Sequence, residues 1–441
     1  MIIPSCIANA DAAASGKVLG FAAGEYAPYN NVEVITALAT AKTFSPTTVF
    51  DQTLVVEMTN ALNAASWNEN TEEVNAIYDG SFEYAYSTDG NVKPFGWHAT
   101  NDRDNATNVR YMWDAATNAG LSATSTSKAL FTKYEAYYGQ EEGYTMPLKA
   151  NTVYELTFVY GGWNDCKKDG YVTMTDPNGA NIEVTVSKLP LDATNGHQDA
   201  SVWKSYKARF QTSEAGNYVL GLRKDNDVST EQSQYVYGDM KLFTAKAENI
   251  DFTFKADYGT LILPFEAEIP AGMEAYTCTE TEDNGITLKL EQATTLEANT
   301  PYVLKKVGAT NDFTFSGIAF SFASSYEVGL LTGTLVDTTA PVGSLVLQNQ
   351  PAGLGFYGVE TDNITVKANR VYVTEEAAGI NIQTLLLPGF ESGINDVKVT
   401  DDVVDVYTID GVKVKKAVKA TEALQGLSKG LYIVGGKKVV K

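Results

Sequence analysis

Apolar and polar residues alternate one by one through much of the chain, and this period of two restricts the fold more than any other feature. The alternation is clearest over 154–160, and it recurs over 206–210 and 218–222. Successive side chains of a β-strand point to opposite faces, so each run predicts a strand with one buried face. Asp176-Pro177-Asn178-Gly179 separates two more such runs and is typical of a turn between paired strands. We predict an antiparallel β-sandwich over residues 75–246.

Two further β-rich stretches follow this sandwich. Alternating runs between Gly-, Asn- and Pro-marked turns occupy residues 248–388, which contain no tryptophan. Residues 393–441 hold two hairpin signals, Asp410-Gly411 and Gly435-Gly436. This last stretch has nine lysines against six acidic residues, whereas the rest of the chain has 24 basic and 48 acidic residues. The reversed charge indicates a separate small β domain.

Helical spacing is confined to the N-terminal part. Val32, Ile35, Leu38 and Ala39 recur at spacings of one, three and four, and Leu54, Met58 and Leu62 at a spacing of four. Ser45 and Pro46 are suitable as the N-cap and first-turn residues of the second helix. We predict an antiparallel helical hairpin over 31–70 that serves as a spacer. Residues 1–30 lack the basic start of a signal peptide and are expected to be a truncated end of an upstream domain or linker.

Length, charge and composition exclude several classes of protein. A chain of 441 residues is expected to hold about two to four domains. With 33 basic and 54 acidic residues the formal charge is −21, which disfavours binding to nucleic acid. No apolar run reaches about 18 residues, so we expect no membrane insertion. The overall fold class is predicted to be mainly β, with tandem jelly-roll sandwiches after the helical hairpin, and the chain is expected to be a monomer.

Signals for catalysis are few. There are only two histidines, His98 and His197, and the three cysteines lie far apart. The G-x-G-x-x-G pattern at 353–358 lies among strand signals without a following helix, so it indicates a glycine-rich turn and not a dinucleotide site. The many carboxylates scatter singly, and they indicate a solvated acidic surface. A glycosidase pair among them stays open as an alternative, because the separation of its two carboxylates depends on the fold.

The aromatic residues give the best indication of function. All five tryptophans lie between 67 and 203, and 15 of the 25 tyrosines between 78 and 237. A sandwich of this size needs only a few aromatic residues in its core, so we expect some of them on the surface, where rings stack on sugars. Trp97 and Trp203 are expected to pack inside. The residues predicted to contact carbohydrate are Trp113, Trp163, Tyr111, Tyr138, Asn164 and Arg223.

Three short segments resemble a known family. Asp79-Gly80-Ser81-Phe82-Glu83, Phe95-Gly96-Trp97 and the closing segment 237–242 (YGDMKL) are similar to the ends of galactose-binding-like jelly rolls, of which carbohydrate-binding modules of families 4 and 22 are members. The resemblance implies that segments 79–83 and 237–242 form the opening and closing strands, which lie side by side. It also implies a structural Ca²⁺ between Glu83 and Asp239, because a hard cation takes oxygen ligands.

The flanking regions carry less specific resemblances. Residues 248–388 are similar to β-rich accessory domains of secreted polysaccharide-active proteins, and 393–441 resemble a C-terminal sorting domain of the type IX secretion class. These resemblances imply a secreted or cell-surface protein that engages export machinery through its C-terminal domain. We therefore expect non-catalytic binding of a neutral plant-type polysaccharide, a xylan or a glucan. A glycoside hydrolase and an adhesin without a sugar ligand are the alternatives.

Overall fold

A computed structural model describes most of the chain, which is divided into two units. The described residues are 8, 11–43, 51–64, 67–82, 84–88, 91–99, 109–112, 129–132, 135–163, 169–190, 204–224, 234–282, 287–350, 353–361, 364–378, 384–388, 403–419, 422–434 and 437–441. Met1–Lys246 form the first unit and Ala247–Lys441 the second. The mainly β fold class with a few short helices is confirmed. The finer division into five parts stays a prediction.

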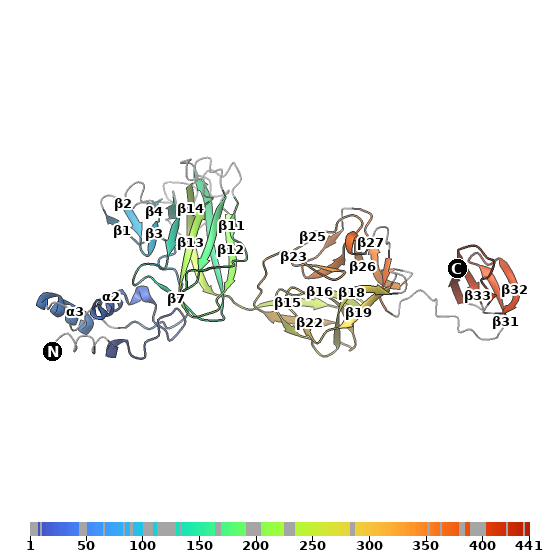
Figure 1. Ribbon diagram of the computed structural model, residues 1–441, viewed down its shortest axis with the longest axis horizontal. Helices are drawn as coiled ribbons and strands as arrows, with labels where there is room; N and C mark the ends of the chain where they lie inside the picture. The colour runs from blue at the N-terminus through green and yellow to red at the C-terminus, as the bar shows by residue number, and fades with distance from the viewer. Residues whose placement is uncertain are drawn as a thin grey trace. The chain divides into compact units, whose positions relative to one another are not determined.

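The N-terminal part of the first unit is helical. It contains the 3₁₀ helix η1 (Pro28–Asn30) and the α-helices α2 (Val32–Lys42) and α3 (Gln52–Ala64), and α2 and α3 lie next to each other in Figure 1. Val34, Leu38 and Ala41 of α2 are buried together with Val55 of α3. The predicted seam was therefore partly wrong, because the helix buries Val34, Ala37 and Ala41 beside Leu38 and leaves Val32, Ile35 and Ala39 half-exposed. Ser45 and Pro46 lie outside the described residues.

The remainder of the first unit is dominated by two antiparallel sheets. One has the order β12-β8-β14-β5-β4, and the other has the order β10-β9-β13-β6-β3 with β11 and β7 added at β9 and β13. A separate hairpin joins β1 (Ala85–Thr88) to β2 (Asn91–Pro94). The other strands are β3 (Trp97–Ala99), β4 (Val109–Met112), β5 (Ala129–Thr132), β6 (Ala136–Tyr138), β7 (Met146–Leu148), β8 (Val153–Trp163), β9 (Gly170–Thr175), β10 (Asn181–Ile182), β11 (Lys188–Leu189), β12 (Lys204–Gln211), β13 (Gly216–Lys224) and β14 (Gln234–Thr244).

The predicted alternation forms the core of this sandwich. Tyr154, Leu156, Phe158 and Tyr160 of β8 are buried, while the residues between them are half-exposed. The turn at Asp176 is also confirmed, since the Asp176 carboxylate accepts hydrogen bonds from the amides of Asn178 at 2.9 Å and Ala180 at 2.7 Å. An aspartate side chain that mimics a backbone turn fixes the register of the β9–β10 hairpin in this way.

The segment before β1 runs beside β14, although the expected opening strand was wrong over residues 79–82. Asp79 and Phe82 have positive φ angles of 47° and 59°, which no strand tolerates. Gly80 O accepts the Met240 amide at 2.9 Å, and Asn75 bonds Met240 O and the Leu242 amide. The predicted neighbourhood of the opening and closing segments is therefore present, with the Asn75 side chain replacing part of a regular backbone ladder.

The second unit contains a ten-stranded sheet of order β16-β21-β18-β19-β30-β27-β26-β29-β24-β23. The first strand of this order, β16, also lies close to β29, which comes much later in the order. Asn369 Nδ2, next to β29, donates a hydrogen bond to Ile262 O of β16 at 3.0 Å. The sheet thus curls upon itself. The strands of this part are β15 (Glu248–Thr253), β16 (Tyr258–Ile262), β17 (Ala267–Glu268), β18 (Met273–Glu282), β19 (Thr287–Gln292), β20 (Thr295–Leu296), β21 (Pro301–Lys306), β22 (Asp312–Gly317), β23 (Ser325–Val328), β24 (Leu331–Thr334), β25 (Thr338–Thr339), β26 (Leu345–Gln350), β27 (Gly353–Gly358), β28 (Thr365–Val366), β29 (Arg370–Val373) and β30 (Thr384–Leu386), with helix α4 (Glu375–Ala378).

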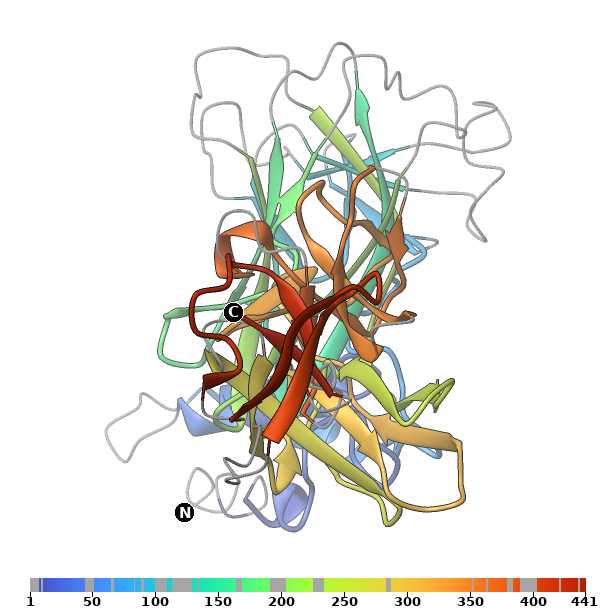
Figure 2. The same ribbon diagram turned by 90° about the vertical axis from the view of Figure 1, so that its right-hand side faces the viewer.

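The chain ends in a small four-stranded sheet of order β32-β31-β33-β34, drawn in red in Figure 2. The strands are β31 (Val403–Thr408), β32 (Lys413–Lys419), β33 (Leu431–Val434) and β34 (Lys437–Val440). Both hairpins expected from the glycine signals are present. Gly411 has a φ of 84° in the first turn, and β33 pairs with β34 across the second.

Candidate functional site

One end of the sandwich contains the last residues of β8 and β13 and the first residues of β9 and β14. Trp163 of β8 is paired with Gln234 of β14, and Lys224 of β13 with Gly170 of β9. The two sheets meet here, because the Tyr235 hydroxyl donates to Leu189 O at 3.3 Å and a Cβ built on Gly170 would lie only 2.9 Å from the Tyr235 ring. Glycine at position 170 therefore allows this close approach.

Some of the residues predicted to contact carbohydrate have their backbone at or near this end of the sandwich. Trp163 is the last residue of β8, and Arg223 is the penultimate residue of β13. Tyr111 lies on the same sheet as Trp163, where it pairs with Leu130 of β5. Trp113 and Asn164 lie outside the described residues. The contacts of Trp163, Arg223 and Tyr111 with a sugar stay predictions.

Tyr138 was wrongly predicted to contact carbohydrate. Its side chain is 0% exposed, and its ring packs 5.4 Å from that of Trp97. Its hydroxyl accepts the Tyr78 amide at 2.7 Å, and burial raises the pKa of Tyr138 far above its ordinary value. Alternation in β6 marks one face as apolar, but it does not say whether that face is covered. Trp97, which was expected to pack inside, is 3% exposed and confirmed in that role.

The surplus of tyrosines has a structural explanation that the sequence argument missed. Seven tyrosines of the sandwich are buried, namely Tyr138, Tyr154, Tyr160, Tyr206, Tyr218, Tyr235 and Tyr237. The hydroxyls of Tyr160, Tyr206 and Tyr235 donate to carbonyls of the segment 186–190. A buried tyrosine thus fills the core with its ring and satisfies an otherwise unpaired carbonyl with its hydroxyl. The expectation that a few aromatic residues suffice for the core was wrong.

Glu155, Lys207 and Arg209 form a charge cluster on the sheet that carries Trp163. Glu155 Oε2 accepts Arg209 Nε at 2.8 Å and Nη2 at 2.6 Å, and Lys207 Nζ lies 3.0 Å away. Burial raises the pKa of Glu155, but the hydrogen bonds and charges of Lys207 and Arg209 outweigh this effect and hold the pKa below its ordinary value. A general acid of a glycosidase needs the opposite shift. Glu155 is therefore built as an ionised partner for a buried cation.

Aromatic side chains also gather where the N-terminal segment meets the sandwich. The rings of Tyr29, Tyr78, Phe95 and Tyr144 are half-exposed, and those of Phe95 and Tyr144 stack at 5.7 Å. Tyr78 links the group, with ring distances of 5.1 Å to Tyr29 and 5.5 Å to Tyr144. Sequence reasoning missed this cluster, because Tyr29 and Tyr144 come from segments more than a hundred residues apart and no spacing signal joins them.

Of the two residues predicted to bind a metal ion, the structure describes one, Asp239. Asp239 lies in the bulge of β14 with a φ of 52°, and its carboxylate bonds Lys241 Nζ at 2.9 Å. Glu83 lies outside the described residues. Among the residues that the structure describes, no three His, Cys, Asp or Glu side chains gather closely enough to hold a metal ion. The described part thus supplies Asp239 with an ammonium partner, and a calcium ion at this position stays a prediction.

Several solved structures are similar to this chain at low identity. One is a family 61 carbohydrate-binding module in complex with β-1,4-galactotriose, with 13% identity, a TM-score of 0.27, and coverage of 39% of this chain and 99% of that one. Another is a family 22 xylan-binding domain from Paenibacillus barcinonensis, with 12% identity and a TM-score of 0.22. The match covers 34% of this chain and 87% of that one. A third is an adhesin domain of Lys-gingipain from Porphyromonas gingivalis, with 11% identity and a TM-score of 0.25. The match covers 37% of this chain and 94% of that one. These likenesses describe fold similarity, and no function of this chain follows from them.

No protein-family model matches the sequence, and neither does any curated protein. Among the described residues, no helix is both long and apolar enough to cross a membrane.

Proposed function

We propose that residues 75–246 bind a neutral plant-type polysaccharide, a xylan or a glucan, without cleaving it. The observation that carries this proposal is the position of Trp163 as the last residue of β8, at an end of the sandwich that also includes the backbone of Arg223. Flat sugar faces stack on aromatic rings, while their hydroxyls bond polar side chains nearby. The acidic chain disfavours a polyanionic glycan, because its charge repels a densely charged polymer.

Binding can be tested by affinity electrophoresis of the full chain against xylans and glucans. Trp163→Ala should weaken binding of the preferred polysaccharide by about 1–3 kcal/mol, on the scale of base stacking on aromatic rings. Phe322→Ala, which truncates a 41% exposed ring in the second unit, is the matched control and should leave binding unchanged. Unchanged binding in Trp163→Ala, with an unchanged melting temperature, would remove Trp163 from the site.

Two other functions are distinguished by the same experiment. Reducing-sugar release from a retarded polysaccharide would support the alternative of a glycoside hydrolase. Neither retardation nor release from any polysaccharide of the panel would support an adhesin without a sugar ligand. Retardation without release is the result that we expect.

The calcium site is a second part of the proposal. We infer that Glu83 and Asp239 hold a structural Ca²⁺, which would cross-link the opening and closing segments of the jelly roll. An ion bound only to the folded state raises the melting temperature, so excess chelator should lower it. Asp239→Asn keeps a residue that tolerates positive φ, and its melting temperature should not respond to chelator. A melting temperature that is identical with and without chelator in the unmodified chain would exclude the metal.

The setting of this function is also proposed. We infer that the chain is an accessory region of an exported glycan-degrading system, secreted or held at the cell surface through residues 393–441. Protease treatment of intact producing cells should then remove the protein. Protection until the cells are lysed would contradict surface display.

A further inference from the structure

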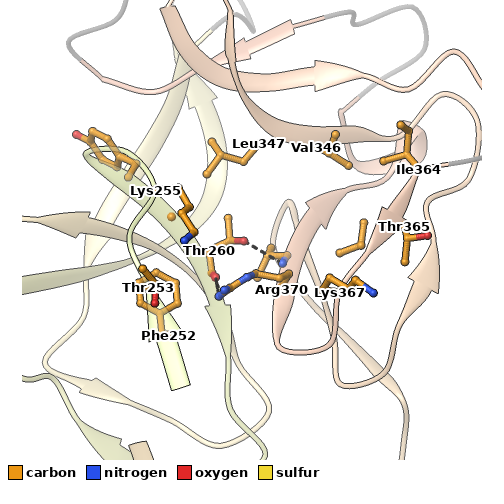
Figure 3. Close-up of a pocket in the computed structure, with 14 residues that line it drawn as sticks. Phe252, Thr253, Lys255, Thr260, Val346, Leu347, Ile364, Thr365, Lys367 and Arg370 are labelled. Atoms are coloured by element: carbon orange, nitrogen blue, oxygen red, sulfur yellow. Dashed lines mark hydrogen bonds between the residues drawn. The ribbon is translucent and has the colours of Figure 1, made fainter. Parts of the chain in front are cut away.

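The second unit contains a pocket of about 380 Å³ at the place where the curled sheet brings β16 close to β29. This volume is within the usual range of small-ligand sites, about 300–1,000 Å³. Figure 3 shows its walls, which come from β15, β16, β26, β28 and β29. Val346, Leu347 and Ile364 form an apolar side, and Lys255 and Arg370 lie on the opposite side.

Charge is distributed unevenly around this pocket. Residues 248–388 contain 18 acidic and only six basic side chains, yet three of those six, Lys255, Lys367 and Arg370, line it. None of the fourteen lining residues is acidic. Lys367 already pairs with Asp337 at 2.8 Å, and its ammonium points away from the other two cations in Figure 3. Lys255 and Arg370 are therefore two cations on one side of a pocket in a region that is otherwise strongly acidic.

Arg370 is held in a fixed position without a carboxylate partner among the described residues. Its Nη1 donates to Thr260 O at 3.1 Å, and its guanidinium carbon lies 4.8 Å from the centre of the Phe252 ring. Thr260 Oγ1 accepts the Val371 amide at 3.1 Å and so fixes the strand that carries Arg370. Among the described residues, one of the five guanidinium N–H donors is thereby used, and the others are open to a ligand.

The partial loss of hydration around the charged Arg370 side chain is unfavourable, and it indicates a functional role for this residue. Burial lowers the pKa of Arg370 from its ordinary value, because the charged form loses hydration. Removing a cation from water without a paired anion is unfavourable, and ionisable groups with shifted pKa values cluster at functional sites. Two carboxylates bond other residues of the pocket lining, since Asp312 accepts Thr253 Oγ1 at 2.6 Å and Asp337 pairs with Lys367.

We propose that this pocket binds the carboxylate of a single acidic sugar residue, a hexuronate, between Lys255 and Arg370. A guanidinium offers parallel donors that match the two oxygens of a carboxylate. The apolar side of Val346 and Leu347 fits the C–H face of the sugar ring, and a pocket of this size admits about one ring. The site is separate from the one proposed for the sandwich. Isolated uronate branches on a largely neutral glycan would suit both sites, since they avoid the dense charge that the acidic chain repels.

Calorimetry on the full chain tests this proposal. Sodium D-glucuronate should bind saturably, and D-glucose, which has the same ring without the carboxylate, should not bind. Lys255→Gln and Arg370→Lys should each weaken glucuronate binding about tenfold or more, because bonds to charged groups are among the strongest in proteins. Lys289→Gln removes another exposed lysine, which pairs with Glu280 outside the pocket, and it should leave the affinity unchanged.

Several results would overturn the proposal. Equal affinity for D-glucose would remove the role of the carboxylate, and equal affinity for inorganic sulfate or phosphate would remove the role of the sugar ring. Unchanged affinity in both pocket variants, with unchanged melting temperatures, would place any glucuronate elsewhere. Trp163→Ala should keep glucuronate binding even where it loses the neutral polysaccharide, so the two proposed sites can fail independently.

Discussion

Two arginines, one in each unit, have very different surroundings for their positive charge. Arg209 in the sandwich has an 8% exposed side chain and bonds Glu155 through two nitrogens. Arg370 in the second unit is half-exposed and has a backbone carbonyl and an aromatic ring as partners, but no carboxylate among the described residues. A cation with its own counter-ion stabilises the fold, whereas one without a counter-ion is available to a ligand. Variants of the two units should therefore respond in opposite ways.

The largest effect is expected in the aromatic core of the sandwich. Trp97→Ala should lower the free energy of unfolding by about 3–5 kcal/mol, because it leaves a cavity between Phe82 and Tyr138. Denaturant titration of the full chain measures this loss. Tyr84→Ala, which truncates a 65% exposed ring, should change the stability by no more than about 0.5 kcal/mol. Equal effects of the two substitutions would mean that the core does not depend on Trp97.

The next effect compares the two arginines directly. Glu155→Gln should cost about 2–3 kcal/mol, since it leaves the Arg209 guanidinium without its anion; 24% of the Glu155 side chain is exposed, so the full cost of a buried pair is not reached. Arg370→Met should leave stability unchanged or raise it, because it replaces a partly dehydrated, unpaired cation by an apolar side chain of similar length. Melting curves of both variants check this contrast. A large loss in Arg370→Met would make Arg370 a structural residue.

The comparison also separates what the sequence predicts from what it does not. The period of two in β8, β12 and β13 identified their buried faces, because alternation follows from strand geometry. It could not tell whether Tyr138 packs inside or lies on the surface, since both arrangements have the same pattern. The seam of α2 was partly misassigned for a similar reason. Several alanines and valines in that helix allow more than one apolar face.

The pocket was not predictable from spacing. Arg370 and Thr260 are 110 positions apart, and only the curl of the ten-stranded sheet brings them together. Lys255 and Arg370 each look like ordinary surface cations in the sequence. The glycine-rich segment 353–358 was wrongly predicted to be a turn, because it forms strand β27.

A smaller effect tests the corrected role of Tyr138. Tyr138→Phe keeps the ring but removes the acceptor of the Tyr78 amide, so it should destabilise the sandwich by about 1–2 kcal/mol. Polysaccharide binding by the folded fraction should not change. Affinity electrophoresis and denaturant titration together give both quantities. Weaker binding at unchanged stability would restore Tyr138 to the sugar site and contradict its burial.

The smallest effect is the pH dependence of the Glu155–Arg209 pair. The folded-state pKa of Glu155 lies below its reference value of 4.5, so the folded state binds its proton less tightly than the unfolded state does. The pair therefore stabilises the fold fully above about pH 4.5, and this contribution is lost as the pH falls through the folded-state pKa. The difference in unfolding free energy between the unmodified chain and Glu155→Gln should thus narrow steadily below pH 4.5. The corresponding difference for Arg370→Met should not follow Glu155, because the two groups lie in separate units. A Glu155→Gln difference that stays constant down to pH 3 would show that Arg209 is stabilised by other groups, and the contrast between the two arginines would then lose its basis.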